Sequence, residues 1–599
     1  MTAESASTVP HTDGAIPPYL MAVLASRFEA IIRDMTNTVM KASRSAVIKN
    51  ARDMSCGVLT YDHRLLTVED GIPIHITALD LTTRPITEYF DDIEEGDAFL
   101  NNCPYTGATH HADLTVCMPV FFEGEPLFWV LSRSHHADIG APIPTTYLPY
   151  ARTVYEEGLH FPCVRVQRKH KDIEDIIRMC RMKIRVPNIW YGDYRAQVGA
   201  CQIGERRIKE LIARYGVGTV KAFVEEWMAY GERRAIAAIR ELPKGTWSYE
   251  TRHDAVPTVA DDGVPVRVTV TVDPDAGLIT VDARDNIDCV PGGINLTEAT
   301  ATGSCRIGVF YNLDSTIPHN EGSASRIKVL LRDGSVVGRP KYPVGTSVAT
   351  TNVNERLVIA VAACFSKMGR PYGMAEGGHM FAAGMAVISG IDSRKQDHAY
   401  VNQMFIGYAS GPAIHGHDGW ITYLASENGG MIVLDSIEID ESMYPIVVEG
   451  RWLEIDTAGA GEFDGAPGVK LIYRPIADDM TVIYASDGED NPGLGVLGGA
   501  AGAPAANFKR LADGSLRRLP AFHAEVVHPG EAIVCQCGAG GGYGEPRRRS
   551  PERVAASANR GWVSPERAAT VYAVALRRDA DGVDWEVDGP ATDALRGVS

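Results

Sequence analysis

The sequence lacks several features that mark whole classes of protein. Its longest apolar stretch, around residues 357–365, is about half as long as the roughly 20 residues that a membrane-spanning helix needs. Residues 1–18 are polar and slightly acidic, without the basic start and apolar run of a secretory signal. The 58 lysines and arginines are outnumbered by 76 aspartates and glutamates, so no general basic field is present to attract nucleic acid. We therefore expect a cytoplasmic protein that binds neither membranes nor nucleic acid.

Paired cysteines are missing as well. The 11 cysteines include no CxxC pair, and the single CxC is formed by Cys535 and Cys537. A disulfide framework needs an even number of cysteines in a small secreted chain, and a four-cysteine zinc site needs paired spacings. The thiols are therefore expected to be reduced and mostly buried.

A nucleotide-binding loop is also not indicated. Residues 493–498 fit the pattern GxGxxG, but Pro492 and Pro504 flank them and no amphipathic helix follows. A dinucleotide site needs the N-terminus of a helix as well as the glycines, so a tight structural turn is the better interpretation. The glycine-rich segment 537–543 does not lead into the Gly-Lys-Ser/Thr of a P-loop. No nucleotide-binding residues are predicted in this chain.

The composition is that of a large globular chain with several subdomains. Its 599 residues, 45% of them hydrophobic, exceed what one hydrophobic core normally organises. Helical spacing of apolar residues predicts one long helix over 19–52 and a helical layer over 171–242. Short β-rich runs fill residues 56–162, among them the run 71–79, and alternation predicts a hairpin over 266–283.

These patterns predict an α+β fold with mixed or antiparallel sheets. Further helices are expected near 354–367 and over 565–570. The predicted divisions are a flexible N-terminus (1–18), a helix with a β-rich metal-site region (19–170), the helical layer (171–245), a β-rich subdomain (246–490) and a glycine-rich C-terminal region (491–599).

One local near-repeat contains the candidate metal-binding histidines and aspartates. Residues 109–114 read Thr-His-His-Ala-Asp-Leu, and residues 134–139 read Ser-His-His-Ala-Asp-Ile. The two copies flank a predicted hairpin whose strands, 114–122 and 127–133, are joined by a four-residue turn, 123–126. Directly opposed residues have Cβ atoms about 4.5–5.5 Å apart. The two His-His-Ala-Asp tetrads, residues 110–113 and 135–138, should therefore meet at the open end of the hairpin.

The pairing expected from that turn places Asp113 opposite His136. Strand alternation would also group His111, Asp113, His136 and Asp138 on one face, although Pro119 inside the first strand is able to impose a bulge that changes the register. Imidazoles and carboxylates without a thiolate suit a divalent metal such as Zn²⁺, Mn²⁺ or Fe²⁺. The alternative is that the histidine pairs are solvated or hydrogen-bonded to nearby loops.

Residues 101–113 and 133–140 resemble two motifs of the hydantoinase B/oxoprolinase family, NNDPYxGGTHLPD and RAHHADIGG. Shorter matches follow in family order at Glu156-Glu157-Gly158, 193–197, 293–295, 320–322, 459–465 and 541–546, so the resemblance covers roughly residues 20–577. It implies one family-length unit built around the hairpin. Relatives in this family include the large subunits of acetone and acetophenone carboxylases.

The resemblance also implies roles for the tetrad residues. It assigns the metal to His110, Asp113 and His135. Asp138 is expected as a fourth ligand or a partner of the ligands, and His136 and His111 as outer or substrate contacts. A neighbouring carboxylate or imidazole would move the proton, and the expected catalytic residues are Asp138, His136 and Glu156. Cys103 stands where the family usually has Asp. We expect a packing thiol there, and the alternatives are a nucleophile, an extra metal ligand or a substrate contact.

Two further groups are open to more than one interpretation. Glu156 and Glu157 follow the histidine site, and either is expected to act as a general base or to hold the local turn in place. The cluster His415, His417 and Asp418 is either a second metal or base site or a surface loop, and the loop is favoured. His75, in an apolar run, is expected to be a buried, hydrogen-bonded histidine rather than a ligand.

The function that the resemblance implies is ATP-dependent hydrolysis of a cyclic amide such as a hydantoin or lactam. A hydantoinase A-type partner subunit, in a hetero-oligomer such as A2B2, would use ATP and Mg²⁺ to phosphorylate the substrate, and metal-activated water on this chain would open the ring. The alternative is the large subunit of an ATP-dependent ketone carboxylase. Hydrolysis is favoured by the His-Ala-Asp tetrads and the modest length. A scaffold subunit with a structural metal is a third, non-enzymatic hypothesis.

Overall fold

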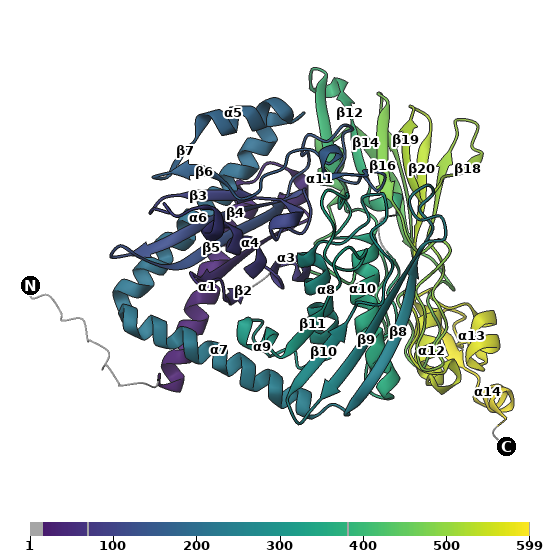
Figure 1. The fold of residues 1–599 in the computed structure, drawn as a ribbon. Coiled ribbons are helices and arrows are strands. Elements are labelled where there is room, and N and C mark those ends of the chain that lie inside the picture. Colours follow the sequence, from purple (N-terminus) through teal and green to yellow (C-terminus); the bar gives the residue numbers. More distant parts are fainter. Residues whose placement is uncertain (1–15, 69–70, 380–381, 598–599) are drawn as a thin grey trace, which may run out of the picture.

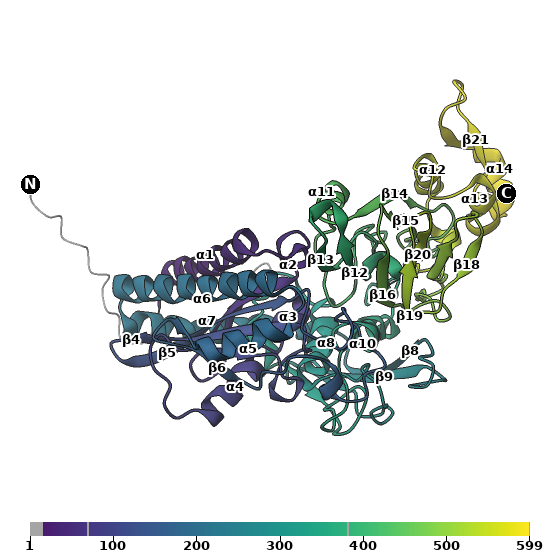
Figure 2. The ribbon, with the colours of Figure 1, turned by 90° about the horizontal axis from the view of Figure 1, so that it is seen from above.

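The computed structural model describes residues 16–68, 71–379 and 382–597, arranged with an N-terminal sheet and its helices at one end and two C-terminal sheets at the other (Figures 1 and 2). Most of the predicted flexible N-terminus, residues 1–15, lies outside the described residues. Within the described ranges, no helix is both long and apolar enough to cross a membrane. The predicted α+β class is confirmed.

The N-terminal sheet has seven antiparallel strands in the order β2-β1-β5-β4-β3-β6-β7. Its strands are β1 (Met54–Thr60), β2 (Leu65–Val68), β3 (Ala98–Asn101), β4 (Asp113–Phe122), β5 (Glu125–His135), β6 (Val164–Arg168) and β7 (Lys171–Asp172). Helix α1 (Pro18–Ala42) packs on β1, and α6 (Pro187–Tyr215) packs on β4 and β5. Both helices lie on the same side of the sheet in Figure 2.

Both faces of this sheet are buried, which explains its nearly continuous apolar strands. On β5, Phe128 and Val130 join the main core, whereas Trp129 and Leu131 belong to a smaller cluster that includes Ile86. Ile86 lies on α4 (Asp80–Tyr89). The hairpin that carries the tetrads is therefore packed between two apolar layers.

The hairpin register differs by one residue from the prediction. Glu123 and Gly124 alone form the turn, both with positive φ (51° and 84°), as in the type I′ turns that favour glycine. A bulge between Val120 and Phe121 then shifts the pairing, so Asp113 lies opposite His135 and not opposite His136. The predicted four-residue turn was wrong because the tight turn brings Glu125 and Pro126 into the second strand.

The helical predictions hold with local corrections. The first helix ends at Ala42 and a short α2 (Ala46–Lys49) follows, instead of one helix to residue 52. The β-rich interpretation of residues 71–79 is wrong, because Pro73 opens a short helix α3 (Pro73–Ile76), where its fixed φ favours the first helical position. The predicted helical layer is present as α5 (Glu174–Lys183), α6 and α7 (Val217–Arg240).

A four-stranded sheet follows in the order β11-β10-β9-β8. It consists of β8 (Gly245–His253), β9 (Val264–Asp273), β10 (Leu278–Asp282) and β11 (Ile327–Leu330). The predicted hairpin over 266–283 is confirmed as the antiparallel pair β9–β10. Helices α8 (Glu298–Phe310) and α10 (Asn352–Cys364) pack against each other, and α10 also packs on β8 and β9. Every residue of α10 is buried, which places this predicted helix in the interior.

Two more sheets form the C-terminal part, in the orders β13-β12-β16-β19 and β14-β15-β20-β17-β18. Their strands are β12 (Val387–Asp392), β13 (His398–Gln403), β14 (Ile446–Leu453), β15 (Val469–Pro475), β16 (Met480–Ala485), β17 (Ala506–Arg510), β18 (Leu516–Arg518), β19 (Phe522–Val527) and β20 (Ala532–Cys537). Around them lie α11 (Ile437–Met443), α12 (Pro551–Asn559), α13 (Pro565–Tyr572), α14 (Gly589–Arg596) and the hairpin β21 (Leu576–Arg578) and β22 (Trp585–Val587). The short helix α9 (Glu321–Ala324) packs instead against α7.

The GxGxxG segment packs against other glycine-rich loops. A Cβ added to Gly493 would lie 2.4 Å from the carbonyl oxygen of Gly377, and Val496 N–H donates to Gly542 at 3.0 Å. No helix begins in residues 493–505, all of which the structure describes. The glycines therefore allow close backbone packing, as the turn interpretation expected.

Candidate metal centre

Three buried side chains converge at the open end of the β4–β5 hairpin. Nε2 of His110 lies 3.1 Å, and Nδ1 of His135 3.4 Å, from Oδ1 of Asp113. One ligand-capable atom from each residue lies within 4.8 Å of the other two. The structure thus brings together the three residues that the resemblance assigns to a divalent metal.

The two oxygens of Asp113 have different surroundings. Oδ2 accepts a 2.5 Å hydrogen bond from the Thr109 hydroxyl and lies 3.3 Å from Nε2 of His75. Oδ1 is buried and has no hydrogen-bonding partner among the described residues. A buried carboxylate oxygen left unpaired between two imidazoles fits a metal ion, because such an oxygen is otherwise costly.

The two imidazoles are oriented by groups outside the cluster. Nδ1 of His110 lies 2.8 Å from the backbone oxygen of Ser347, which accepts only if Nδ1 carries the proton, so in the neutral imidazole the lone pair is on Nε2. Nε2 of His135 lies 3.2 Å from the hydroxyl of Thr146, leaving Nδ1 to face Asp113. Metal-binding histidines usually donate their second N–H to such a carbonyl, carboxylate or water.

Electrostatics favour the ionised form of Asp113. Burial alone would raise the pKa of this carboxyl, but the neighbouring imidazoles of His110 and His75 hold it well below its usual range. Burial alone would lower the pKa of His110, and the neighbouring Asp113 reverses that effect and raises it. The centre therefore holds an anionic ligand in a buried position.

Asp53 and His75 complete the wall of the centre, and the sequence did not indicate Asp53. The carboxylate of Asp53 lies 3.8 Å from Nδ1 of His135 and 3.6 Å from Nε2 of His75. Asp53 precedes β1, which pairs with β5 and brings Met54 opposite Ser134. Only this long-range pairing places Asp53 beside the tetrads, so no local pattern could have found it. His75 is buried and within 3.3 Å of the Ser55 hydroxyl, as expected.

The neighbouring histidines point to other partners. Nδ1 of His111 lies 2.8 Å from the buried carboxylate of Glu157, which also accepts from Thr346 N–H at 2.5 Å. Nε2 of His136 lies 2.9 Å from Oε1 of Gln197 on α6. Both side chains are bound to elements outside the three-residue cluster.

Asp138 and Glu156 make local contacts. Asp138 is buried and accepts from the backbone N–H of Arg185 at 2.6 Å, from its guanidinium at 3.0 Å and from Gly140 N–H at 3.0 Å. Glu156 is exposed and caps a short helical turn by accepting from the N–H and hydroxyl of Thr153. Of the two expectations for Glu156, its contacts match that of holding the turn.

Cys103 and the His415 cluster lie apart from these contacts. Burial raises the pKa of the Cys103 thiol, which is the environment of a packing thiol. Asp418 accepts from the Arg549 guanidinium at 2.7 and 2.8 Å, whereas His415 lies 3.2 Å from Arg370. Asp418 is therefore engaged in an ion pair.

A small cavity adjoins the centre. It has a volume of about 20 Å³ and is lined on one side by Asp53, His75, Asp113 and His135. Its other side is lined by Tyr147, Thr350, Gln403, Glu427 and neighbouring residues. A cavity needs roughly 10–15 Å³ to hold one water molecule, so this one accommodates a single water-sized molecule.

Comparisons with known proteins support the resemblance. The sequence profile described as Hydantoinase B/oxoprolinase matches residues 17–546. The beta subunit of caprolactamase from Pseudomonas jessenii is 30% identical over 600 residues, which cover 97% of this chain and 99% of that protein. The crystal structure of the ATP-dependent caprolactamase from this organism has a TM-score of 0.86 at 28% identity, and covers 97% of this chain and 100% of the other.

Two further relatives represent different activities. A protein of Pseudomonas sp. (strain NS671), named as a putative D-/L-hydantoinase subunit, is 27% identical over 607 residues, covering 96% of this chain and 98% of that protein. A nucleotide-free structure of acetone carboxylase has a TM-score of 0.87 at 20% identity, covering 97% of this chain and 82% of the other. At that identity the likeness shows a shared fold alone.

Proposed function

The chain belongs to the hydantoinase B/oxoprolinase family, and from that premise we propose that it is the metal-bearing subunit of an ATP-dependent hydrolase of cyclic amides. A hydantoinase A-type partner would bind ATP and Mg²⁺ and phosphorylate the substrate, in an assembly such as A2B2. The proposal is supported by two relatives that are named as subunits, one of a caprolactamase and one of a hydantoinase.

The single observation that carries the proposal is the unpaired Oδ1 of Asp113 between His110 and His135. The ligands would be these three residues, and Asp53 would be a fourth because its carboxylate faces the same histidine. Imidazole and carboxylate donors are compatible with zinc, manganese or iron. When bound, such an ion supplies a Lewis acid and a water of lowered pKa for attack on an activated amide carbon.

The residues of the chain prepare this chemistry. Ser347 fixes the tautomer and orientation of His110, Thr146 orients the ring of His135, and Thr109 holds the outer oxygen of Asp113. All three ligands would be buried, and the adjoining cavity has room for one water molecule, so few water molecules would reach the reacting group.

The remaining predicted site residues would hold neighbouring segments of the chain in place. Asp138 fixes the segment after His135 through Arg185 and Gly140. His136 ties the end of the hairpin to α6, and His111 ties it to Glu157. Glu156 would hold the turn beside Glu157, and Cys103 would pack as a buried thiol. We assign none of these five side chains to proton transfer.

The second candidate is the large subunit of a ketone carboxylase, because acetone carboxylase shares the fold. In that case the metal would organise a carbon nucleophile and CO₂ instead of water. The decisive experiment is product analysis of this chain co-purified with its partner subunit, with ATP and a panel of lactams, hydantoins and acetone, with and without bicarbonate.

A ring-opened amino acid formed without bicarbonate is the expected product. A carboxylated product that requires bicarbonate would overturn the proposal in favour of the carboxylase. His110→Ala and His135→Ala should abolish turnover and lower the metal content, with His417→Ala, in an exposed loop, as the matched histidine control. Full activity of the first two variants would leave only a scaffold role for the centre.

A further inference from the structure

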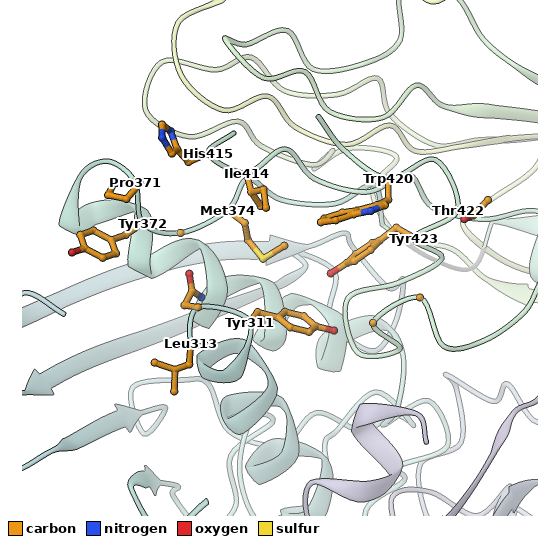
Figure 3. A pocket seen from close by; sticks show the side chains of 14 residues that line it. Tyr311, Leu313, Pro371, Tyr372, Met374, Ile414, His415, Trp420, Thr422 and Tyr423 are labelled. Atoms are coloured by element: carbon orange, nitrogen blue, oxygen red, sulfur yellow. The ribbon is translucent and has the colours of Figure 1, made fainter. Parts of the chain in front are cut away.

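A second cavity, much larger than that of the metal centre, opens beside it. It has a volume of about 590 Å³. Figure 3 shows Tyr311 below it, at the end of α8, and Trp420 and Tyr423 above it on a loop, with Met374 between them. Its lining residues are Tyr311, Asn312, Leu313, Pro371, Tyr372, Gly373, Met374, Ile414, His415, Trp420, Thr422, Tyr423, Gly429 and Gly430.

The chemistry of this aromatic pocket suits a ring. Four aromatic side chains supply flat apolar faces, while Asn312, His415 and Thr422 add a few polar groups. Among the described residues, no lysine or arginine lines the pocket. Pockets for small molecules are typically apolar and aromatic, with a small number of polar groups that fix orientation.

The metal cavity cannot hold a ring in the conformation described. Its volume is about 20 Å³, whereas a cavity of about 150 Å³ is the size that binds benzene. A five- to seven-membered cyclic amide therefore fits the aromatic pocket and not the closed metal cavity. Ring opening at the centre requires the wall of that cavity to move.

One short segment separates the two cavities. Glu427 and Asn428 line the metal cavity, and the next two residues, Gly429 and Gly430, line the aromatic pocket. Both glycines have positive φ, 57° and 74°, and are exposed. The Tyr311 hydroxyl donates to the backbone oxygen of Ser426, which ties the segment to the pocket wall. Residues 426–430 thus form a partition that contacts both cavities.

Two unpaired polar atoms line the metal cavity at the partition, one on the partition itself and one on β13. Oε2 of Glu427 and Oε1 of Gln403 are buried without a hydrogen-bonding partner in the described part of the chain, and both residues line the metal cavity. The two side chains are 1% and 2% exposed. An unpaired buried acceptor such as the amide oxygen of Gln403 indicates a missing donor, and the ring N–H of a cyclic amide is one.

We propose that the aromatic pocket is the ring-binding site of the substrate, and that the partition 426–430 moves to let the amide group reach the metal centre. This inference deepens the proposed function and depends on it for the identity of the ring. Gln403 then accepts the ring N–H at the inner end of the path, beside Glu427.

The test measures binding of ε-caprolactam, 2-pyrrolidinone and hydantoin to the full chain by ligand-observed NMR and calorimetry, without ATP. Trp420→Ala and Tyr372→Ala should each weaken ring binding by about fivefold, since each removes one aromatic contact from the pocket. Trp452→Ala is the matched control, because Trp452 is similarly exposed (48%, against 54% for Trp420) and lines a different cavity. Metal content should be the same in all three variants.

A second pair of variants tests the partition. A Cβ on Gly430 would meet nothing within 4 Å, so Gly430→Phe should fill the pocket and abolish ring binding. Gly430→Ala carries the same backbone strain without the bulk and should bind the ring as wild type does. Equal ring binding by Gly430→Phe and Gly430→Ala, or by Trp420→Ala and wild type, would overturn the inference.

The outcome is separable from that of the proposed function. His135→Ala should lose metal and turnover but keep ring binding, since His135 does not line the aromatic pocket. Loss of ring binding in His135→Ala, with the fold retained, would place the ring at the metal centre and overturn the inference while leaving the hydrolase intact. In the assembled complex, Trp420→Ala should raise KM more than it lowers kcat.

Discussion

Asp113 lies directly opposite His135 across the β4–β5 pair, with its Oδ1 3.4 Å from Nδ1 of the histidine. The tight turn at Glu123-Gly124 and the bulge after Val120 together fix this pairing. A shift of one residue would turn the imidazole to the opposite face of the sheet. The geometry of the centre is therefore set about 10 residues away, at the closed end of the hairpin.

Asp113→Asn should release the metal. The substitution keeps the shape but removes the charge between two imidazoles, so we expect at least a hundredfold loss of metal affinity, with the metal content measured by mass spectrometry after dialysis. Thr109→Val removes only the 2.5 Å hydrogen bond to the outer oxygen and should cost about 10–100-fold. His136→Ala should retain the metal. A variant Asp113→Asn with full metal content would contradict the ligand assignment.

The sequence predicted the three converging residues and the hairpin, because both depend on local patterns and on a family motif. It could not predict the register, since a single bulge decides it and Val120-Phe121 resembles any other apolar pair. Asp53 was missed because its place depends on the pairing of β1 with β5, which are far apart in sequence. The β-rich prediction for residues 71–79 was wrong because Pro73 starts a helix where the isoleucines suggested a strand.

Gly107→Ala should destabilise the chain far more than Gly124→Ala. Both glycines have φ near +85° (86° and 84°), so each substitution carries a similar backbone cost of about 1–2 kcal/mol. A Cβ on Gly107 would also lie 2.0 Å from the carbonyl oxygen of Leu81, whereas one on Gly124 meets nothing within 4 Å. Urea denaturation should show the larger loss for Gly107→Ala, and equal losses would refute the close approach.

Gln197→Leu should loosen the open end of the hairpin. Its amide nitrogen donates to the backbone oxygens of Leu114 and Ser132, at 2.8 and 2.9 Å, and its oxygen faces His136. Each buried group left unpaired costs about 1–3 kcal/mol, so we expect a loss of about 2–4 kcal/mol in the free energy of unfolding. Hydrogen exchange should rise at Leu114 and Ser132. An unchanged free energy of unfolding would show that the hydrogen bonds of Gln197 make no net contribution to stability.

Two buried acids, Asp435 and Asp440, should make the stability fall as the pH rises. Burial raises the pKa of Asp435, and burial together with the nearby Asp435 raises that of Asp440, above the usual 3.8. Within the described ranges, neither oxygen of Asp440 has a hydrogen-bonding partner. The native state then binds more protons than the unfolded state. The stability that this proton binding contributes is fully present below pH 3.8 and is lost as the pH rises through the higher pKa of the native state. Asp440→Asn should therefore raise the melting temperature at pH 8 more than at pH 5. The control Asp581→Asn, at an exposed position, should leave the melting temperature unchanged at both pH values. An Asp440→Asn gain that is equal at both pH values would show that Asp440 is already ionised at pH 5.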